Sequence, residues 1–347
     1  MVRVHEFCRL ATSPAPQGAA CQGLKPAARC SGVILCHPLW LVLGMVTAGV
    51  PSARGENVLR IVLDPTRVTI QAGDRPVLQY RYAVVPYKPY VEQIPSPGGI
   101  QVLRDSPFDH KHHHSLMFAV AVDKVNFWEE TPAAGRQAHK GFSRMDLVTQ
   151  AGVERAVFTE NLDWINPRES RVLLQESRTI ETYQAADLGA SLATWRSRFT
   201  LPPGKASADV SGSEYFGLGV RFLQSMDTGG AFVNADGKTG VAGTNAARSA
   251  WCAYSAKADG KPVTIAVFDH PTNPRYPATW FTMDKAFAYL AATLNLAKEP
   301  LVVKADKPLE LQYGVAVWDG TIAAEPIRKL YERWVALLTP PPSRSQR

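Results

Sequence analysis

Cysteine is nearly absent from most of this chain. Only Cys252 lies beyond residue 55, and the other four are Cys8, Cys21, Cys30 and Cys36. The part of the chain after residue 55 therefore forms no intramolecular disulfide. Burial of apolar side chains has to hold it together instead.

Three further absences narrow the possible functions. No run of Lys and Arg interleaved with aromatic residues is present to track a phosphate backbone, so we expect no nucleic-acid partner. No GxGxxG or GxxxxGK(S/T) motif follows a predicted strand, which removes the usual nucleotide-binding sites. After residue 50, no apolar stretch is long enough to span a bilayer.

The N-terminal region has the pattern of a secretory leader. Residues 33–50 form an apolar run preceded by four basic residues, and Ala53 and Gly55 supply small side chains at the positions a signal peptidase reads. We expect residues 1–55 to be removed and the mature chain to be periplasmic or extracellular. A retained membrane anchor is the alternative, because this run reaches the low end of the roughly 17 to 25 residues that span a bilayer.

Removing the leader changes the charge balance. The whole chain has 38 Lys and Arg against 31 Asp and Glu, a net charge of +7. Taking away the five basic residues and the one acidic residue of the leader leaves 33 and 30, a net charge of +3. About 290 residues remain, enough for one large domain. We predict this domain at residues 56–339 and a disordered tail at residues 340–347.

Short runs that alternate apolar and polar residues predict an all-β protein. Turn formers such as Pro97-Gly98-Gly99 and Asp259-Gly260 separate these runs, a pattern typical of a large antiparallel β-sandwich. The predicted strands are residues 58–63, 76–85, 115–122, 171–183, 191–201, 263–270 and 309–318. One C-terminal helix is predicted at residues 321–338, where apolar residues recur at helical spacing and indicate a structural cover on a sheet.

Histidine is concentrated in one segment. Four of the eight histidines, His110, His112, His113 and His114, occupy five consecutive positions after Asp109. Imidazole exchanges protons near neutral pH and is also the commonest metal ligand. An extended backbone would put His110, His112 and His114 on one face, whereas a nearby proline favours an irregular loop. We predict a catalytic site in which Asp109, His110, His112 and His113 act through protons.

Distant polar residues extend this candidate site. Glu176 is predicted as a catalytic base, with Asp109 as the alternative. The predicted substrate-binding residues are Trp128, Arg178, Arg221, His270, Asn273 and Arg275. Since loops gather at the rims of a sandwich, we expect residues 109–113 and 269–275 to border one concave site with Arg221 and Glu176 nearby. No cofactor is expected. The alternative is zinc or copper bound by His110, His112 and a distant histidine such as His139.

Ordered motifs along the chain resemble a bacterial family labelled "methane oxygenase PmoA", otherwise a domain of unknown function. The motifs are Lys88-Pro89-Tyr90, Gly98-Gly99, residues 104–113, Asn126-Phe127-Trp128, Glu176-Ser177-Arg178, residues 217–221 and residues 269–275. The resemblance implies a secreted β-sandwich similar to the galactose-mutarotase supersandwich. His114 and Ser115 replace the Arg and Gly that end the family's D-H-x-H-H-R-G run. Methane oxidation does not follow, because the oxygenase subunit of that name is a polytopic membrane protein.

Three classes of function remain. The first is an enzyme that acts on a carbohydrate by acid and base catalysis, as an epimerase, lyase or hydrolase. The second is a metal-dependent hydrolase or oxygenase that uses the histidines. The third is a carbohydrate-binding module without turnover, which would display exposed Trp128, Trp164 and Trp280. The abundance of histidine argues against the third class, and the close spacing of the histidines favours proton transfer over metal binding. We therefore expect the first class, with a carbohydrate or another small molecule as partner.

The leader generates the first testable prediction. When the full-length precursor is expressed in a bacterium, we expect the exported protein to begin at or near Glu56. Intact-mass spectrometry of the exported protein checks this. A mass that retains residues 33–50 would show a membrane anchor instead.

Overall fold

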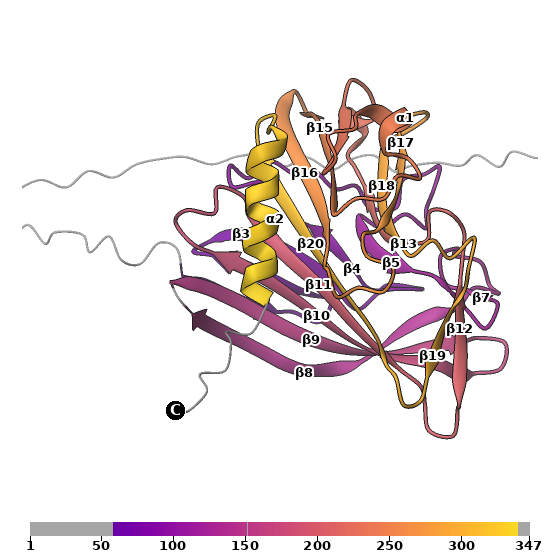
Figure 1. Ribbon diagram of the computed structural model, residues 1–347. Helices are drawn as coiled ribbons and strands as arrows, with labels where there is room; N and C mark the ends of the chain where they lie inside the picture. The colour runs from indigo at the N-terminus through magenta and orange to yellow at the C-terminus, as the bar shows by residue number, and fades with distance from the viewer. Residues whose placement is uncertain (1–57, 151, 339–347) are drawn as a thin grey trace, which may run out of the picture. The chain divides into compact units, whose positions relative to one another are not determined.

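Two large antiparallel sheets stack against each other and carry a long helix on one side (Figure 1). The computed structural model describes residues 58–150 and 152–338. Within those ranges each large sheet has eight strands, and a third sheet has four. The predicted fold class, an antiparallel β-sandwich with one C-terminal helix, is confirmed. The predicted leader and tail lie outside the described residues and stay predictions.

The spatial order of the strands in the three sheets differs from their order along the chain. The first sheet contains β1 (Leu59–Leu63), β2 (Arg67–Ala72), β3 (Arg75–Arg81), β4 (Tyr90–Gln93), β5 (Leu116–Ala119), β13 (Gly217–Arg221), β18 (Tyr289–Thr293) and β17 (Thr279–Met283). The second sheet contains β14 (Ala231–Asn234), β15 (Trp251–Ala258), β16 (Lys261–Asp269), β20 (Leu309–Asp319), β11 (Ser191–Thr200), β10 (Arg171–Gln184), β9 (Val153–Asn166) and β8 (Arg136–Gln150). The small sheet contains β19 (Leu301–Lys304), β12 (Ser207–Ser211), β6 (Ala121–Val122) and β7 (Val125–Asn126). The helical elements are η1 (Gln224–Met226), α1 (Gly240–Thr244) and α2 (Ala324–Leu338).

The alternation of side chains along β16 shows how the second sheet is buried on both faces. Val263, Ile265 and Val267 point into the core shared with the first sheet. Ala266 and Phe268 point the other way, into a second apolar cluster. Successive residues of a strand face opposite sides of a sheet, so one strand serves both cores.

Helix α2 covers the outer face of the second sheet. Ile327, Leu330 and Trp334 recur at helical spacing and are buried against that face. Trp334 is fully buried, and its indole N–H donates a hydrogen bond of 2.8 Å to Thr194 Oγ1. A side chain at Gly314 on β20 would come within 2.8 Å of the Trp334 ring, so glycine makes room for the helix.

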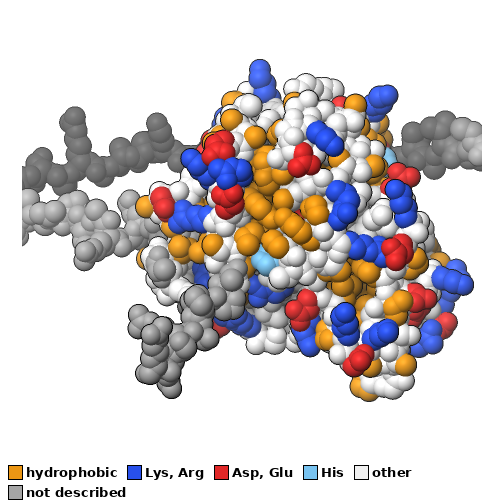
Figure 2. All heavy atoms as spheres, viewed as in Figure 1, with side chains coloured by type: hydrophobic (Ala, Val, Ile, Leu, Met, Phe, Trp, Pro, Cys, Tyr) orange, Lys and Arg blue, Asp and Glu red, His pale blue; other side chains and the backbone are white. Residues whose placement is uncertain are grey.

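The face of the molecule that carries α2 has a mixed charge pattern. Figure 2 shows Lys and Arg interspersed with Asp and Glu around an apolar area beside the helix, with no large region of one sign. Among the residues that the structure describes, no helix is long and apolar enough to cross a membrane.

The packing of α2 generates the second prediction. Replacing Trp334 by alanine should lower the free energy of unfolding by about 3 to 5 kcal/mol, because it leaves a large cavity between helix and sheet. Urea denaturation followed by circular dichroism measures the change. Arg328→Ala on the exposed side of α2 is the matched control and should change stability little, since exposed ion pairs contribute little. Equal losses in both variants would contradict this account of the helix.

Candidate functional site

The histidine segment lines a cavity of about 450 Å³ at the β17–β18 side of the first sheet. Two loops and a hairpin form its walls. The loop between β4 and β5 supplies the histidines, the loop after β7 supplies Trp128 and Glu129, and the β17–β18 hairpin supplies most of the remainder. The lining residues are His110, His112, His113, Trp128, Glu129, Tyr215, Phe281, Met283, Lys285, Ala286, Phe287 and Tyr289.

Consecutive turns, rather than an extended strand, gather three of the histidines. The His110 N–H donates to Pro107 O at 3.0 Å, and the His113 N–H donates to His110 O at 2.9 Å. These turns bring the ring centroids of His110 and His113 to 4.7 Å and those of His112 and His113 to 4.6 Å. The segment is therefore the irregular loop that the nearby proline favours, and not an extended strand with His110, His112 and His114 on one face. His113 joins the cavity and His114 does not.

Two of these histidines lie beside a carboxylate. His110 Nδ1 is 3.1 Å from Asp109 Oδ2, and His112 Nδ1 is 3.5 Å from Glu129 Oε2. Glu129 is a residue that the sequence analysis missed, although it directly follows the Asn126-Phe127-Trp128 motif. Each pair places an imidazole, a group able to accept or donate a proton, beside an acidic neighbour. Burial lowers the pKa of His112.

His113 differs from its neighbours because it is buried. Burial, together with the positive charge of nearby His112, His110 and Arg221, lowers the pKa of His113 to about 2. The ring therefore stays neutral near neutral pH and is unsuited to the role of a general acid. His113 is better placed to hydrogen-bond a ligand, and its Nδ1 has no hydrogen-bond partner among the described residues.

Other polar atoms at this cavity are also buried without a partner. Within the described ranges they include Trp128 Nε1 and the Tyr289 hydroxyl. Buried polar groups in folded proteins are almost always hydrogen-bonded, so each such atom calls for an explanation. Because these atoms have almost no accessible surface, a ligand in the cavity would reach them only after side chains around them move.

Arg221, a predicted substrate-binding residue, lies beside the cavity. It is almost fully buried, and its guanidinium carbon is 3.7 Å from the centroid of the Phe287 ring that lines the cavity. Arg221 Nη2 is 3.9 Å from Asp109 Oδ2 and 3.8 Å from Asp227 Oδ2. Burial lowers the pKa of Arg221, and these two carboxylates counteract that effect. Arg221 is thus close to the histidines, as expected.

Glu176 and Arg178 lie in the core instead of the cavity. Both side chains are fully buried, and Arg178 Nη2 lies 2.7 Å from Glu176 Oε2. The two oxygens of Glu176 also accept hydrogen bonds from Trp164 Nε1 at 2.8 Å and from Ser197 Oγ at 2.6 Å. A carboxylate enclosed by core donors has no path to a substrate. The structure therefore does not support Glu176 as a catalytic base or Arg178 as a ligand-binding residue.

The second polar cluster, residues 269–275, is also separate from the cavity. Asn273 donates to Asp269 at 2.6 Å and to the Gln312 carbonyl at 2.7 Å, which ties the end of β16 to β20. The His270 ring packs edge-on against Trp334 of α2 at 5.5 Å. Arg275 donates to the carbonyl groups of Leu294, Glu299 and Pro300. None of these residues lines the histidine cavity, so the structure does not bring the two clusters into one site.

The structure also differs from two expectations of the sequence analysis, a metal site that includes His139 and exposed tryptophan side chains. His139 Nδ1 lies 2.6 Å from Glu160, and its ring contacts Tyr82 and Phe142. Across the described part of the chain, no group of three or more His, Cys, Asp and Glu is arranged to hold a metal ion. Trp128, Trp164 and Trp280 are all buried in the main apolar core, and Trp128 also lines the cavity.

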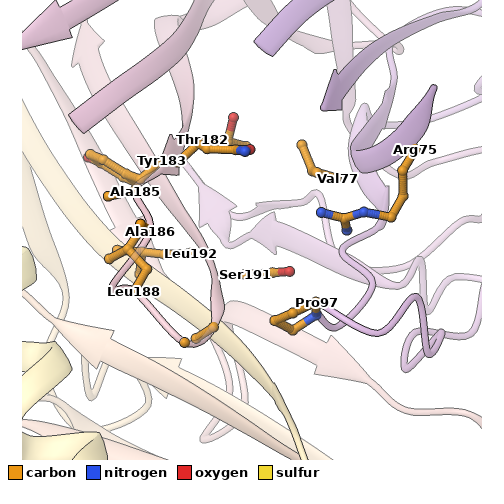
Figure 3. A pocket seen from close by; sticks show the side chains of 13 residues that line it. Arg75, Val77, Pro97, Thr182, Tyr183, Ala185, Ala186, Leu188, Ser191 and Leu192 are labelled. Atoms are coloured by element: carbon orange, nitrogen blue, oxygen red, sulfur yellow. The ribbon is translucent and has the colours of Figure 1, made fainter. Parts of the chain in front are cut away.

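A second cavity, of about 270 Å³, has fewer side chains that could bind or transfer a proton. It lies between the β10–β11 hairpin and the residues Arg75, Val77 and Pro97 (Figure 3). Arg75 is its single charged lining residue, and no histidine or carboxylate lines it. The histidine cavity is therefore the better candidate for a functional site.

Comparison with known proteins identifies the family. The model named "Family of unknown function (DUF6807)" matches residues 67–332, so the chain belongs to this family. The predicted membership of the methane oxygenase PmoA family is wrong, because the match is to DUF6807 and nothing points to PmoA. No curated protein matches the chain.

Solved structures share the chain's general architecture at low sequence identity. An α-galactosidase from Lactobacillus brevis is 6% identical, with a TM-score of 0.44 over 80% of this chain and 42% of that one. The GH36 α-galactosidase AgaA from Geobacillus stearothermophilus, in complex with raffinose, is 9% identical, with a TM-score of 0.43 over 79% and 43%. The chain thus spans about two fifths of their length. Because these TM-scores are below 0.5, no conclusion about this chain's chemistry follows from them.

The burial of Glu176 generates the third prediction. Glu176→Ala should lower the free energy of unfolding by about 3 to 5 kcal/mol, because it leaves the buried Arg178 charge uncompensated. Urea denaturation measures this loss. Glu169→Ala, which removes an exposed partner of Arg171, is the control and should have little effect. Near-normal stability in the Glu176 variant, with loss of ligand binding, would return Glu176 to the functional site.

Proposed function

We propose that the histidine cavity binds a sugar or a similar polyhydroxylated molecule and transfers protons to and from it. The observation that carries this proposal is the pair of imidazole–carboxylate contacts, Asp109–His110 and Glu129–His112, in one cavity. Acid and base catalysis needs two titratable groups that reach the same substrate. The cavity volume also falls within the roughly 300 to 1,000 Å³ typical of small-molecule sites.

The remaining lining residues suit a molecule with both apolar and polar faces. Tyr215, Phe281 and Phe287 supply aromatic surface against which a sugar ring can pack. His112, Glu129 and Lys285 supply accessible polar groups for its hydroxyl groups. A small number of polar groups within an apolar wall is the usual composition of a specific ligand site.

Each polar residue has a defined role in this proposal. His110, oriented by Asp109, exchanges a proton with one oxygen or carbon of the substrate. His112, beside Glu129, acts on the other side of the reacting bond. His113 stays neutral and holds the substrate by hydrogen bonding, and Arg221 fixes Asp109 from behind. The chemistry is of the epimerase, lyase or hydrolase type, in the periplasm or outside the cell.

The fourth prediction tests the role of His110. Proton NMR of the mature protein with a panel of free sugars, uronic acids and glycosides should identify a substrate that is converted. With that substrate, His110→Gln should lower kcat by about 10²- to 10⁴-fold while KM changes little, because glutamine keeps hydrogen bonding and cannot exchange protons.

The control for this experiment is Lys111→Gln. Lys111 is an exposed residue of the same loop and does not line the cavity, so kcat should stay near the wild-type value. An undiminished kcat in His110→Gln would remove His110 from the mechanism. If the wild-type protein converts no sugar in the panel, the proposed reaction class is wrong.

A further inference from the structure

His114 contacts two carboxylates that come from opposite walls of the histidine cavity. His114 Nδ1 lies 2.7 Å from Asp105 Oδ1, at the start of the loop that carries the other histidines. His114 Nε2 lies 2.7 Å from Glu130 Oε1, in the loop that carries Trp128 and Glu129. The histidine itself is almost completely buried.

The geometry requires a cation at this position. A carboxylate accepts hydrogen bonds, so both ring nitrogens have to carry a proton, and an imidazole with two N–H groups is positively charged. Lys88 is the second cation of the cluster, and its Nζ donates to Glu130 at 2.8 Å. Two cations thus balance the two carboxylates of Asp105 and Glu130. With a neutral ring at 114, one of the two carboxylates would lose a hydrogen-bond donor and keep other donors, such as Lys88 for Glu130 or the Tyr90 hydroxyl for Asp105.

Further contacts fix the cluster on every side. The Tyr90 ring stacks on His114 with centroids 4.5 Å apart, and the Tyr90 hydroxyl donates to Asp105 at 2.8 Å. Ser106 Oγ lies 3.0 Å from His114 Nδ1. Lys88 Nζ also donates to the carbonyl of Trp128 at 3.0 Å, which anchors a lining residue of the cavity directly.

We infer that His114 is a cationic positioning residue that holds the two walls of the proposed sugar site at their working distance. It does not line the cavity and touches no substrate. Its Nε2 contact with Glu130 connects the loop at residues 105–115 to the loop at residues 127–135, and its Nδ1 contact with Asp105 fixes the ring within the first loop. Charge-assisted hydrogen bonds are about twice as strong as neutral ones, so the bond to Glu130 is a strong link between the loops. The hydrogen-bonded bridge itself does not depend on the proposed function. Only the statement that it positions a sugar site rests on that function.

The fifth prediction tests this bridge by hydrogen exchange of the full mature protein. His114→Gln has the size to fill the space, but it is uncharged and cannot donate to both carboxylates. Backbone amides in residues 105–115 and 127–135 should then exchange about tenfold faster or more, relative to amides of β15 and β16. Glu130→Gln should produce the same pattern from the opposite wall, and it covers the case in which His114→Gln fails to fold.

Two further variants separate charge from general packing. His114→Arg keeps a cation with several donors and should restore exchange to within about threefold of wild type. Glu181→Gln removes a buried carboxylate paired with Arg155 at 3.2 Å on β10, and it should leave both cavity loops unchanged. With a sugar identified in the NMR screen, His114→Gln should raise KM, and His114→Arg should restore it.

Unchanged exchange in both His114→Gln and Glu130→Gln would overturn the inference. Equally fast exchange in His114→Arg and His114→Gln would overturn the requirement for a cation. The exchange measurement needs no ligand, so its outcome is independent of the sugar screen. A negative screen with accelerated exchange would refute the proposed function and leave the bridge supported.

Discussion

The buried ion pair of Arg178 and Glu176 connects the interior of the sandwich to the cavity at its edge. Arg178 on β10 of the second sheet donates to the carbonyl of Pro89, which lies just before β4 of the first sheet. The residues on either side of Pro89 are Lys88 and Tyr90, which bind the carboxylates that flank His114. Lys88, Pro89 and Tyr90 thus link the core residue Arg178 to both walls of the cavity. A fully buried ion pair is costly to break, so Glu176 holds Arg178 in a fixed position.

The fold was largely predictable because alternation along strands depends on local sequence alone. Each predicted strand has a counterpart, for example residues 171–183 in β10, because one apolar face shows as a period of two. Twelve of the twenty strands in the described residues were not predicted. Among them are β8, an edge strand whose mostly exposed side chains lack that period, and β9, whose burial does alternate. Which strands become neighbours, such as β13 beside β5, depends on distant contacts that no local pattern contains.

The sequence showed where the site lies but not which residues line it. The density of histidine marked the loop, but backbone turns decided that His113 lines the cavity while His114 faces its partners. The two-residue spacing of Glu176 and Arg178 showed that they share a strand face. It could not show that this face is the core. The aromatic walls, such as Phe287 and Tyr289, come from a hairpin about 170 residues away along the chain, and nothing in their own sequence distinguishes them from core residues.

The position of β20 has a consequence for the order in which the protein can be completed during synthesis. This strand lies between β16 and β11 in the middle of the second sheet, yet only α2 follows it in the described chain. Until residue 319 has left the ribosome, β11 and β16 each have an open edge, and until α2 follows, Phe268 and Trp318 face solvent. Open strand edges and exposed aromatic side chains promote aggregation. The second sheet therefore keeps two open edges and an uncovered aromatic face until the last strand and helix of the described chain are in place.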